Sequence, residues 1–528
     1  MSIRHPYSSI SGTYQSGGPI CIITNIHQQN IHSPNKKQND MNPIEELTPK
    51  GVWKNFYALT QIPRPSGHTE KVANYLIDFA KKNGAEAYLD EAGNVIMKKG
   101  ATPGYEDRAT TVLQAHMDMV PQKTKDCPHN FETDPLDVYI DGEWVTARNT
   151  TLGSDDGMGV AAAMAIIEDE TVEHGPLEVL ITRDEETGMD GAFGLKAGEL
   201  SGKYLLNMDS ETEGEITIGC AGGMDILCQM EYQELNVNPD NMLCYTIAIK
   251  GLLGGHSGIE IHKGRANANK LMARILFAAV NTDMAWLCSW HGGNMRNAIP
   301  RECEAVVLVP KNMQDEFLAL IEKSKNIFTE EFKDIETNGF QLTATLSETI
   351  PQKAVPQDIQ ENLINAILAA HDGVLRYTPS LPEPVETSCN LAIIDIADGK
   401  AEIITLARSS QDSMKQYLCN GLLACFSMAG MHVSLDGAYS GWQPNTSSKL
   451  VDIMVKVYEQ LFGSKPLVGA CHAGLECGII GAKYPQMDMA SFGPTQLAIH
   501  TPDERCNIPS VERFYKFVLE ILKNIPEE

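Results

Sequence analysis

The sequence has no stretch of about 18 uninterrupted apolar residues, the length that a membrane-spanning helix needs. Its first residues lack the basic, apolar and small-residue succession of a secretory signal. The 13 cysteines are scattered and include no CxxC pair, which suits a reducing compartment better than a disulfide framework. These absences together predict a soluble protein of the cytoplasm.

Basic residues are also scarce, because 42 Lys and Arg face 69 Asp and Glu and give a formal net charge of -27. This excess of negative charge repels phosphate backbones and anionic lipids, so we expect neither a nucleic-acid partner nor a membrane partner. Excess carboxylates commonly form a solvated surface, but they are also the groups that bind divalent cations. Charge alone does not choose between these interpretations.

The 528 residues exceed what one hydrophobic core usually supports, which predicts two or more domains. Residues 1–40 are rich in Ser, Gln, Asn, Gly and His and have no sustained period, so we expect a disordered N-terminal extension. From Met41 an amphipathic helical pattern begins. The first folded part is therefore expected to span residues 41–223.

Helical and strand patterns alternate within residues 41–223 at the spacing of a parallel sheet, which predicts an α/β domain. The patterns lie at residues 68–84 (helix), 86–100 (hairpin), 110–120 (strand), 156–169 (helix), 177–186 (strand) and 203–210 (strand).

Longer alternating runs begin near residue 224 and predict a second domain, inserted over residues 224–440. One strand–helix–strand unit occurs twice there, so the insertion is expected to consist of two related sandwich halves. The pattern of the first domain returns over residues 441–528, which should complete it. The insertion could form a lid or a dimerisation surface, so a homodimer is one of the alternatives.

Acidic and histidine side chains follow the apolar runs, where an open parallel sheet places its ligands. In His116-Met117-Asp118 the two polar side chains share one face of an extended chain, so Asp118 can orient the His116 ring toward a metal. Taken singly, such a short motif is more often a solvated strand end. The other candidates, each equally weak alone, are Asp155, Asp184, Glu185, Glu186, Asp209 and His500.

Together these residues form a set of nitrogen and oxygen ligands that suits zinc, with one carboxylate able to bridge two ions. Two adjacent ions polarise a carbonyl and acidify a water, while an unligated carboxylate accepts the proton. The set therefore predicts amide hydrolysis.

Six blocks carry a resemblance to the cocatalytic-zinc metallopeptidases of the aminoacylase and glutamate carboxypeptidase type, from about Met41 to the end of the chain. They read AHMDMV, TTLGSDDG, DEETGMDGAFGL, NMDSETEGEITIGCAGG, GGHSGIEIHKGRANANK and CHAGLECG. Within that group they look most like the aminoacyl-histidine (Xaa-His, carnosinase-like) dipeptidases. The resemblance implies a zinc-peptidase-like catalytic domain with a mixed central sheet flanked by helices, and an inserted α+β lid of two ferredoxin-like halves.

The resemblance also implies residue roles in a site with two divalent cations. Asp155 would bridge the ions, in an Asp155–Asp156 peptide bond that is often cis in the family. His116 and Asp209 would complete one ion site, and Glu186 and His500 the other.

Other residues would act on the substrate or on the ligands. By the same resemblance, Glu185 would be the general base, Asp118 would orient His116, and His256 would stabilise the oxyanion. Asn297 and Arg408 would bind the substrate, since the arginine fork suits a C-terminal carboxylate. A surface or packing role is the alternative for His256, Asn297 and Arg408. His472 and Glu476 are candidates without an assigned role.

We expect a metallo-dipeptidase that cleaves short peptides, with Xaa-His dipeptides as the preferred substrates and zinc, cobalt or manganese as the metal. A tripeptidase or an N-acyl amino acid deacylase with the same metal centre is the alternative enzyme. A metal-free binding or scaffold protein is the alternative of another class, because fold does not fix function.

Overall fold

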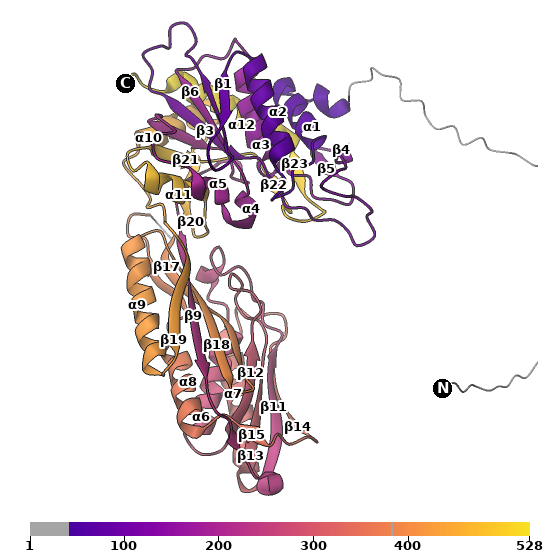
Figure 1. Cartoon of the computed structure of the whole chain (residues 1–528), viewed down its shortest axis with the longest axis vertical. Coiled ribbons are helices and arrows are strands. Elements are labelled where there is room, and N and C mark those ends of the chain that lie inside the picture. The colour runs from indigo at the N-terminus through magenta and orange to yellow at the C-terminus, as the bar shows by residue number, and fades with distance from the viewer. Residues whose placement is uncertain (1–41, 382–383) are drawn as a thin grey trace, which may run out of the picture. The chain divides into compact units, whose positions relative to one another are not determined.

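The computed structural model of the chain describes residues 42–381 and 384–528 (Figure 1). The disordered extension expected at residues 1–40 lies outside them. Residues 42–528 form one compact unit. Within the described ranges, no helix has the length and apolar character needed to cross a membrane.

The first sheet has eight strands in the order β1-β2-β6-β3-β7-β21-β8-β20. Their bounds are β1 Glu86–Leu89, β2 Val95–Lys99, β3 Thr111–His116, β6 Leu177–Thr182, β7 Tyr204–Asn207, β8 Glu215–Cys220, β20 Leu467–Cys471 and β21 Asp488–Ser491. β3 runs parallel to both β6 and β7, whereas β2 is antiparallel to β6. This mixed sheet confirms the expected fold class.

Helices cover both faces of the eight-stranded sheet because its strands alternate apolar side chains toward each face. Leu113 and Ala115 of β3 belong to the core formed with α1 (Lys50–Thr60), α2 (Glu70–Lys82), α3 (Ser154–Glu168), α10 (Lys449–Phe462) and α12 (Ile508–Asn524). Val112 faces the other core, formed with α5 (Asp190–Gly194) and α11 (Glu476–Lys483). Gln114 and His116 alternate with Leu113 and Ala115 along β3, so they share the face of α11.

The second sheet is antiparallel, in the order β14-β11-β13-β12-β17-β18-β9-β19, with β16 paired to β17. Its strands are β9 Gly222–Glu231, β11 Met242–Lys250, β12 Trp286–Gly292, β13 Cys303–Pro310, β14 Gln341–Ser347, β16 Gly373–Tyr377, β17 Val385–Ala397, β18 Lys400–Ser409 and β19 His432–Tyr439. The helices packed on it are α6 Ala268–Val280, α7 Gln314–Phe332, α8 Gln357–Ala369 and α9 Asp412–Met428 (Figure 1).

The two expected halves of this region share one sheet, because β12 pairs with β17 through Trp290, His291 and Gly292. Pairing these strands satisfies backbone groups that would otherwise form two exposed edges. The strands of this sheet come from residues 222–439, between the two groups of strands that build the first sheet. The domain boundaries proposed at residues 223 and 440 stay predictions.

Two small sheets, two short helices and three 3₁₀ turns complete the described part of the chain. The turns are η2 Pro239–Asn241, η3 Ile261–Lys263 and η4 Lys311–Met313. The strands are β4 Val138–Asp141, β5 Trp144–Ala147, β22 Gln496–Leu497 and β23 Arg505–Asn507 in one sheet, and β10 Leu235–Asn236 and β15 Lys353–Ala354 in the other. The short helices at the start of the chain and of the site are η1 Pro43–Glu46 and α4 Glu185–Gly188.

The helical pattern that begins at Met41 is interrupted in the structure. A 3₁₀ turn, η1, ends at Glu46, and α1 begins only at Lys50. Pro49 lies between them with an extended backbone and caps α1. Proline has no N–H to donate and disfavours the helical conformation of the residue before it, so one continuous helix cannot pass through this position.

We predict that Gly421→Ala stabilises the protein. Gly421 lies inside α9 with open space where a Cβ would be, so alanine should raise the free energy of unfolding by about 0.5–1 kcal/mol. Gly478→Ala is the matched control, because in α11 the new Cβ would lie 2.5 Å from the Ser440 carbonyl oxygen and should destabilise. Urea unfolding measures both, and a loss of stability in Gly421→Ala contradicts the prediction.

Candidate metal centre

The carboxyl ends of three neighbouring parallel strands bring polar side chains to one edge of the first sheet. His116 is the last residue of β3, and Asp209 follows β7 by two residues. Glu185 and Glu186 open the short helix α4 just after β6. Since β6, β3 and β7 are adjacent in the sheet, these groups converge although they are far apart in sequence.

Asp155 enters the same space from the start of α3. It lies at a kink where its backbone and that of Asp156 are not helical. The Asp155–Asp156 peptide bond is cis, as the resemblance implied.

Asp155 faces two histidines with its two carboxylate oxygens. Its Oδ1 is 3.2 Å from His116 Nε2, and its Oδ2 is 3.1 Å from His500 Nε2. Asp209 Oδ1 is 3.3 Å from His116 Nε2, and Glu186 Oε2 is 3.0 Å from His500 Nε2. One carboxylate thus joins two groups of potential ligands.

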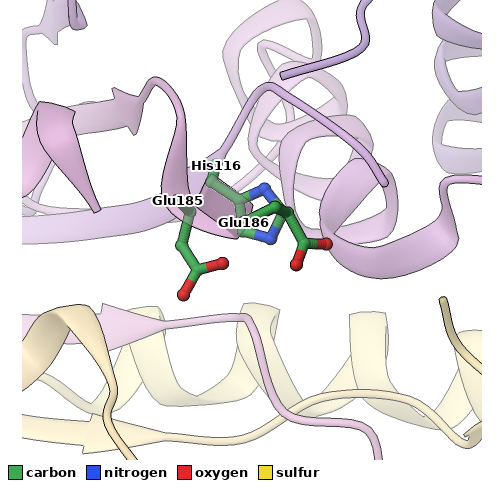
Figure 2. A group of neighbouring side chains, drawn as sticks. All are labelled: His116, Glu185 and Glu186. Atoms are coloured by element: carbon green, nitrogen blue, oxygen red, sulfur yellow. The ribbon is translucent and has the colours of Figure 1, made fainter. Parts of the chain in front are cut away.

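Three overlapping sets of these side chains have ligand atoms within 4.8 Å of one another, close enough to hold a metal ion. The sets are His116, Asp155 and Asp209; Asp155, Glu186 and His500; and His116, Glu185 and Glu186. Figure 2 shows the third set as neighbouring side chains at the end of β3 and the start of α4.

The electrostatics of the cluster are those of buried carboxylates crowded around two histidines. Burial raises the pKa of Asp209 well above its usual range, and burial together with Glu476 and Glu186 raises the pKa of Glu185 to about 8. Hydrogen bonds to Asp155 and Glu186 raise the pKa of His500 to about 11. Buried carboxylates so close together are costly unless cations neutralise them. The donor set therefore fits divalent cations of borderline softness.

Asp118 lies behind His116, as the spacing of the motif predicts. Its Oδ1 is 3.4 Å from His116 Nδ1, the ring nitrogen that faces away from Asp155. Its carboxylate also accepts hydrogen bonds from Ser66 Oγ (2.7 Å) and from the backbone N–H groups of Glu185 (3.1 Å) and Glu186 (3.3 Å). Asp118 therefore holds both the histidine ring and the turn that carries the two glutamates.

Residues 112–524 match the Peptidase family M20/M25/M40. The chain belongs to this family. It is a metal-dependent peptidase, and the strand ends that carry the candidate ligands lie within the matched region.

Relatives of this M20 peptidase cover nearly the whole chain. It is 42% identical to the cytosol non-specific dipeptidase of Escherichia coli, over 92% of this chain and 100% of the relative. The crystal structure of the aminoacylhistidine dipeptidase from Vibrio alginolyticus matches with a TM-score of 0.87 and 41% identity, over 92% of this chain and 99% of that one. The aminopeptidase PepT from Bacillus cereus, at 15% identity and a TM-score of 0.52, shares the fold.

Two buried charged residues that the sequence analysis missed support the loops of the M20 peptidase site. Arg64 donates to the carbonyl oxygens of Met117 and Asp118 (both 3.0 Å) and to that of Gly153. It therefore ties the segment after His116 to the segment before Asp155. A lone arginine in the loop IPRPSG gave no signal of this role.

Glu504 accepts four hydrogen bonds from the loop that leads into Asp155. Its Oε2 accepts from the N–H groups of Leu152 (2.8 Å) and Gly153 (3.1 Å), and its Oε1 from the N–H and hydroxyl of Ser154 (both 2.8 Å). Glu504 lies in the segment IHTPDE, which also carries His500. Its closeness in sequence to a predicted ligand was the sign that could have pointed to it.

His256 and Asn297 are brought together on the second sheet. Their segments pair through Ser257 N–H to the Asn297 carbonyl and Ile299 N–H to the Gly255 carbonyl, both 2.8 Å. Both side chains line a pocket of about 810 Å³, and no member of the metal cluster is among the described residues that line it. The structure thus joins these two predicted residues to each other, but it does not join them to the cluster.

Arg408 and His472 lie in buried positions of their own. Arg408, on β18, donates from Nη1 to the Tyr439 hydroxyl at 3.2 Å. His472 Nε2 is 2.7 Å from the Ser388 hydroxyl, and burial lowers the pKa of His472 to about 3. The positive charge of Arg408 helps to lower the pKa values of both His472 and His256.

We predict that Glu504→Gln weakens metal binding and lowers stability. The new amide group would face N–H donors of the 152–154 loop, and each buried donor left unpaired costs about 1–3 kcal/mol. Glu512→Gln, at an exposed position of α12, is the control. Urea unfolding and metal content after dialysis measure the two effects. If the two variants have the same stability and the same metal content, Glu504 does not support the loop that carries Asp155.

Proposed function

We propose that this M20 peptidase is a cytosolic dipeptidase that binds two zinc ions, and that Xaa-His dipeptides are among its substrates. The observation that carries the proposal is the placement of Asp155, whose two oxygens each face a histidine of a separate ligand group. The names of the two relatives above 40% identity, one a non-specific dipeptidase and one an aminoacylhistidine dipeptidase, support the substrate class.

Asp155 would bridge the ions, with His116 and Asp209 on one side and Glu186 and His500 on the other. Zinc suits this set of imidazole and carboxylate ligands, and cobalt or manganese would also be accepted. When bound, the ions supply Lewis-acid polarisation of the scissile carbonyl and acidification of the attacking water.

Glu185 is the proposed general base. Its side chain lies beside Glu186 and His116, and its raised pKa makes the carboxylate a stronger proton acceptor than an exposed glutamate. In the reaction Glu185 would take a proton from the attacking water and give it to the leaving amine. The backbone N–H of Glu185 is held by Asp118, so the base and the His116 ring share one anchor.

His256 is the proposed oxyanion donor, and its loop selects the tautomer that this role needs. The ring Nδ1 accepts hydrogen bonds from the N–H groups of Gly258 (3.1 Å) and Ile259 (3.0 Å). Burial and Arg408 lower the pKa of His256, which keeps the ring neutral. A neutral ring that accepts at Nδ1 carries its proton on Nε2, so it presents one N–H donor.

Arg408 and Asn297 are proposed to bind the substrate, with the guanidinium of Arg408 paired to the C-terminal carboxylate. His256 and Asn297 share a pocket apart from the cluster. We propose that the second sheet closes over the site of its own chain in the manner of a lid; in a homodimer, action of His256 at the site of the other copy is the alternative.

We predict that Glu185→Gln abolishes turnover while the protein keeps its metal. The substitution removes the proposed base and leaves every proposed metal ligand in place. Asp155→Ala is the contrasting variant and should lose both metal and activity, since the shared carboxylate holds both groups together. Metal analysis and kcat of the purified proteins distinguish the two. Activity of Glu185→Gln above a tenth of wild type would overturn the assignment of the base.

A substrate panel tests the proposed specificity. We expect hydrolysis of dipeptides with free amino termini, Xaa-His and Xaa-Gly included, and slower hydrolysis of tripeptides and N-acetyl amino acids. Comparison of kcat/KM across the panel, with and without a chelator, measures this. Faster hydrolysis of tripeptides or N-acetyl amino acids would favour the tripeptidase or deacylase alternative. Binding of peptides without turnover or metal would favour the scaffold alternative.

A further inference from the structure

Four fully buried polar side chains lie next to the proposed metal ligands and are linked to one another by hydrogen bonds. Gln114, Asn207 and Glu476 have no exposed surface, and neither has Thr182. Each comes from a different element, namely β3, β7, α11 and β6. The proposed mechanism uses none of the four.

Hydrogen bonds connect these side chains in one line. The Thr182 hydroxyl and the Gln114 amide Nε2 both donate to Oε2 of Glu476, each at 2.6 Å. Asn207 Nδ2 in turn donates to Oε1 of Gln114. Glu476, at the first turn of α11, is therefore the shared acceptor that joins Thr182 to Gln114.

The side chains of this line that come from strands lie close to the carboxyl ends of those strands, just before the proposed ligands. Gln114 precedes His116 by two residues and Asn207 precedes Asp209 by two. Gln114 and Asn207 are register partners, as are His116 and Thr182, so these side chains share one face of the sheet. The line thus fixes the ends of β6, β3 and β7 relative to one another.

We propose that Glu476 is a positioning residue for the metal centre, acting through Thr182 and Gln114. Its carboxylate holds the ends of β6 and β3, and through Asn207 the end of β7, so that the proposed ligands on these strand ends converge. Glu476 has no exposed surface, so it does not contact the substrate itself. This inference rests on the proposed metal site.

A purely structural role explains the line less well. The second oxygen of Glu476, Oε1, is buried without a hydrogen-bond partner, which costs stability. An apolar side chain would pack α11 on the sheet without that cost. What the carboxylate adds is a fixed acceptor for two donors from two ligand-bearing strands.

The test uses the full-length zinc-loaded protein and measures how fast excess EDTA removes zinc, together with kcat. Glu476→Leu removes the acceptor and should release zinc about 10- to 100-fold faster, the range typical when a group that supports a ligand is lost. Thr182→Val removes one donor at nearly constant shape and should change the rate in the same direction by less. Glu476→Gln keeps an oxygen for both donors and should restore near wild-type release.

Glu178→Leu is the matched control, because Glu178 is a buried carboxylate at the other end of β6. It accepts hydrogen bonds from the Ser201 hydroxyl and the Gly202 N–H, both 2.9 Å. This variant should lower Tm without faster zinc release.

Three outcomes would overturn the inference. If Glu476→Leu and Thr182→Val release zinc no faster than Glu178→Leu, the line supports only the fold. If Glu476→Gln releases zinc as fast as Glu476→Leu, the hydrogen bonds of Glu476 do not position the site. A wild-type protein that binds no zinc would overturn the proposed metal site, and with it this inference.

Discussion

Repulsion among carboxylates at one edge of a parallel sheet is the constraint on which the rest of this structure depends. Asp155, Glu186 and Asp209 each lie within 3.3 Å of a histidine nitrogen, in a setting where burial raises acid pKa values. Cations relieve that repulsion, but only if the backbone holds the side chains in place before binding. The arrangement around the cluster supplies that rigidity.

Three buried charged residues connect the loops and strand ends that carry the cluster. Arg64 joins the segments of His116 and Asp155, Glu504 holds the turn before Asp155, and Glu476 joins the strand ends. Each is an ionisable group removed from water, which is tolerated because hydrogen bonds compensate it. The catalysis proposed for Glu185 would thus depend on these supporting groups as well as on the proposed ligands.

The hydrophobic periods in the sequence predicted the helices and strands of the first sheet, and the strand-end rule located His116 and Asp209. The resemblance added Glu185 as the base and the cis peptide bond after Asp155. Local patterns could not predict the contacts of Arg64 or Glu504, because the partners of Arg64 lie 53 to 89 residues away in the chain and those of Glu504 about 350. They also could not show that the two halves of the second region form one sheet, since the β12–β17 pairing is long-range.

Anomalous X-ray diffraction at the zinc edge would show whether two ions share Asp155. Crystals of the protein purified with zinc should show two peaks of comparable height. One should lie between His116 and Asp209 and the other between Glu186 and His500, with Asp155 between the peaks. A single peak, or two peaks that do not share Asp155, would contradict the account.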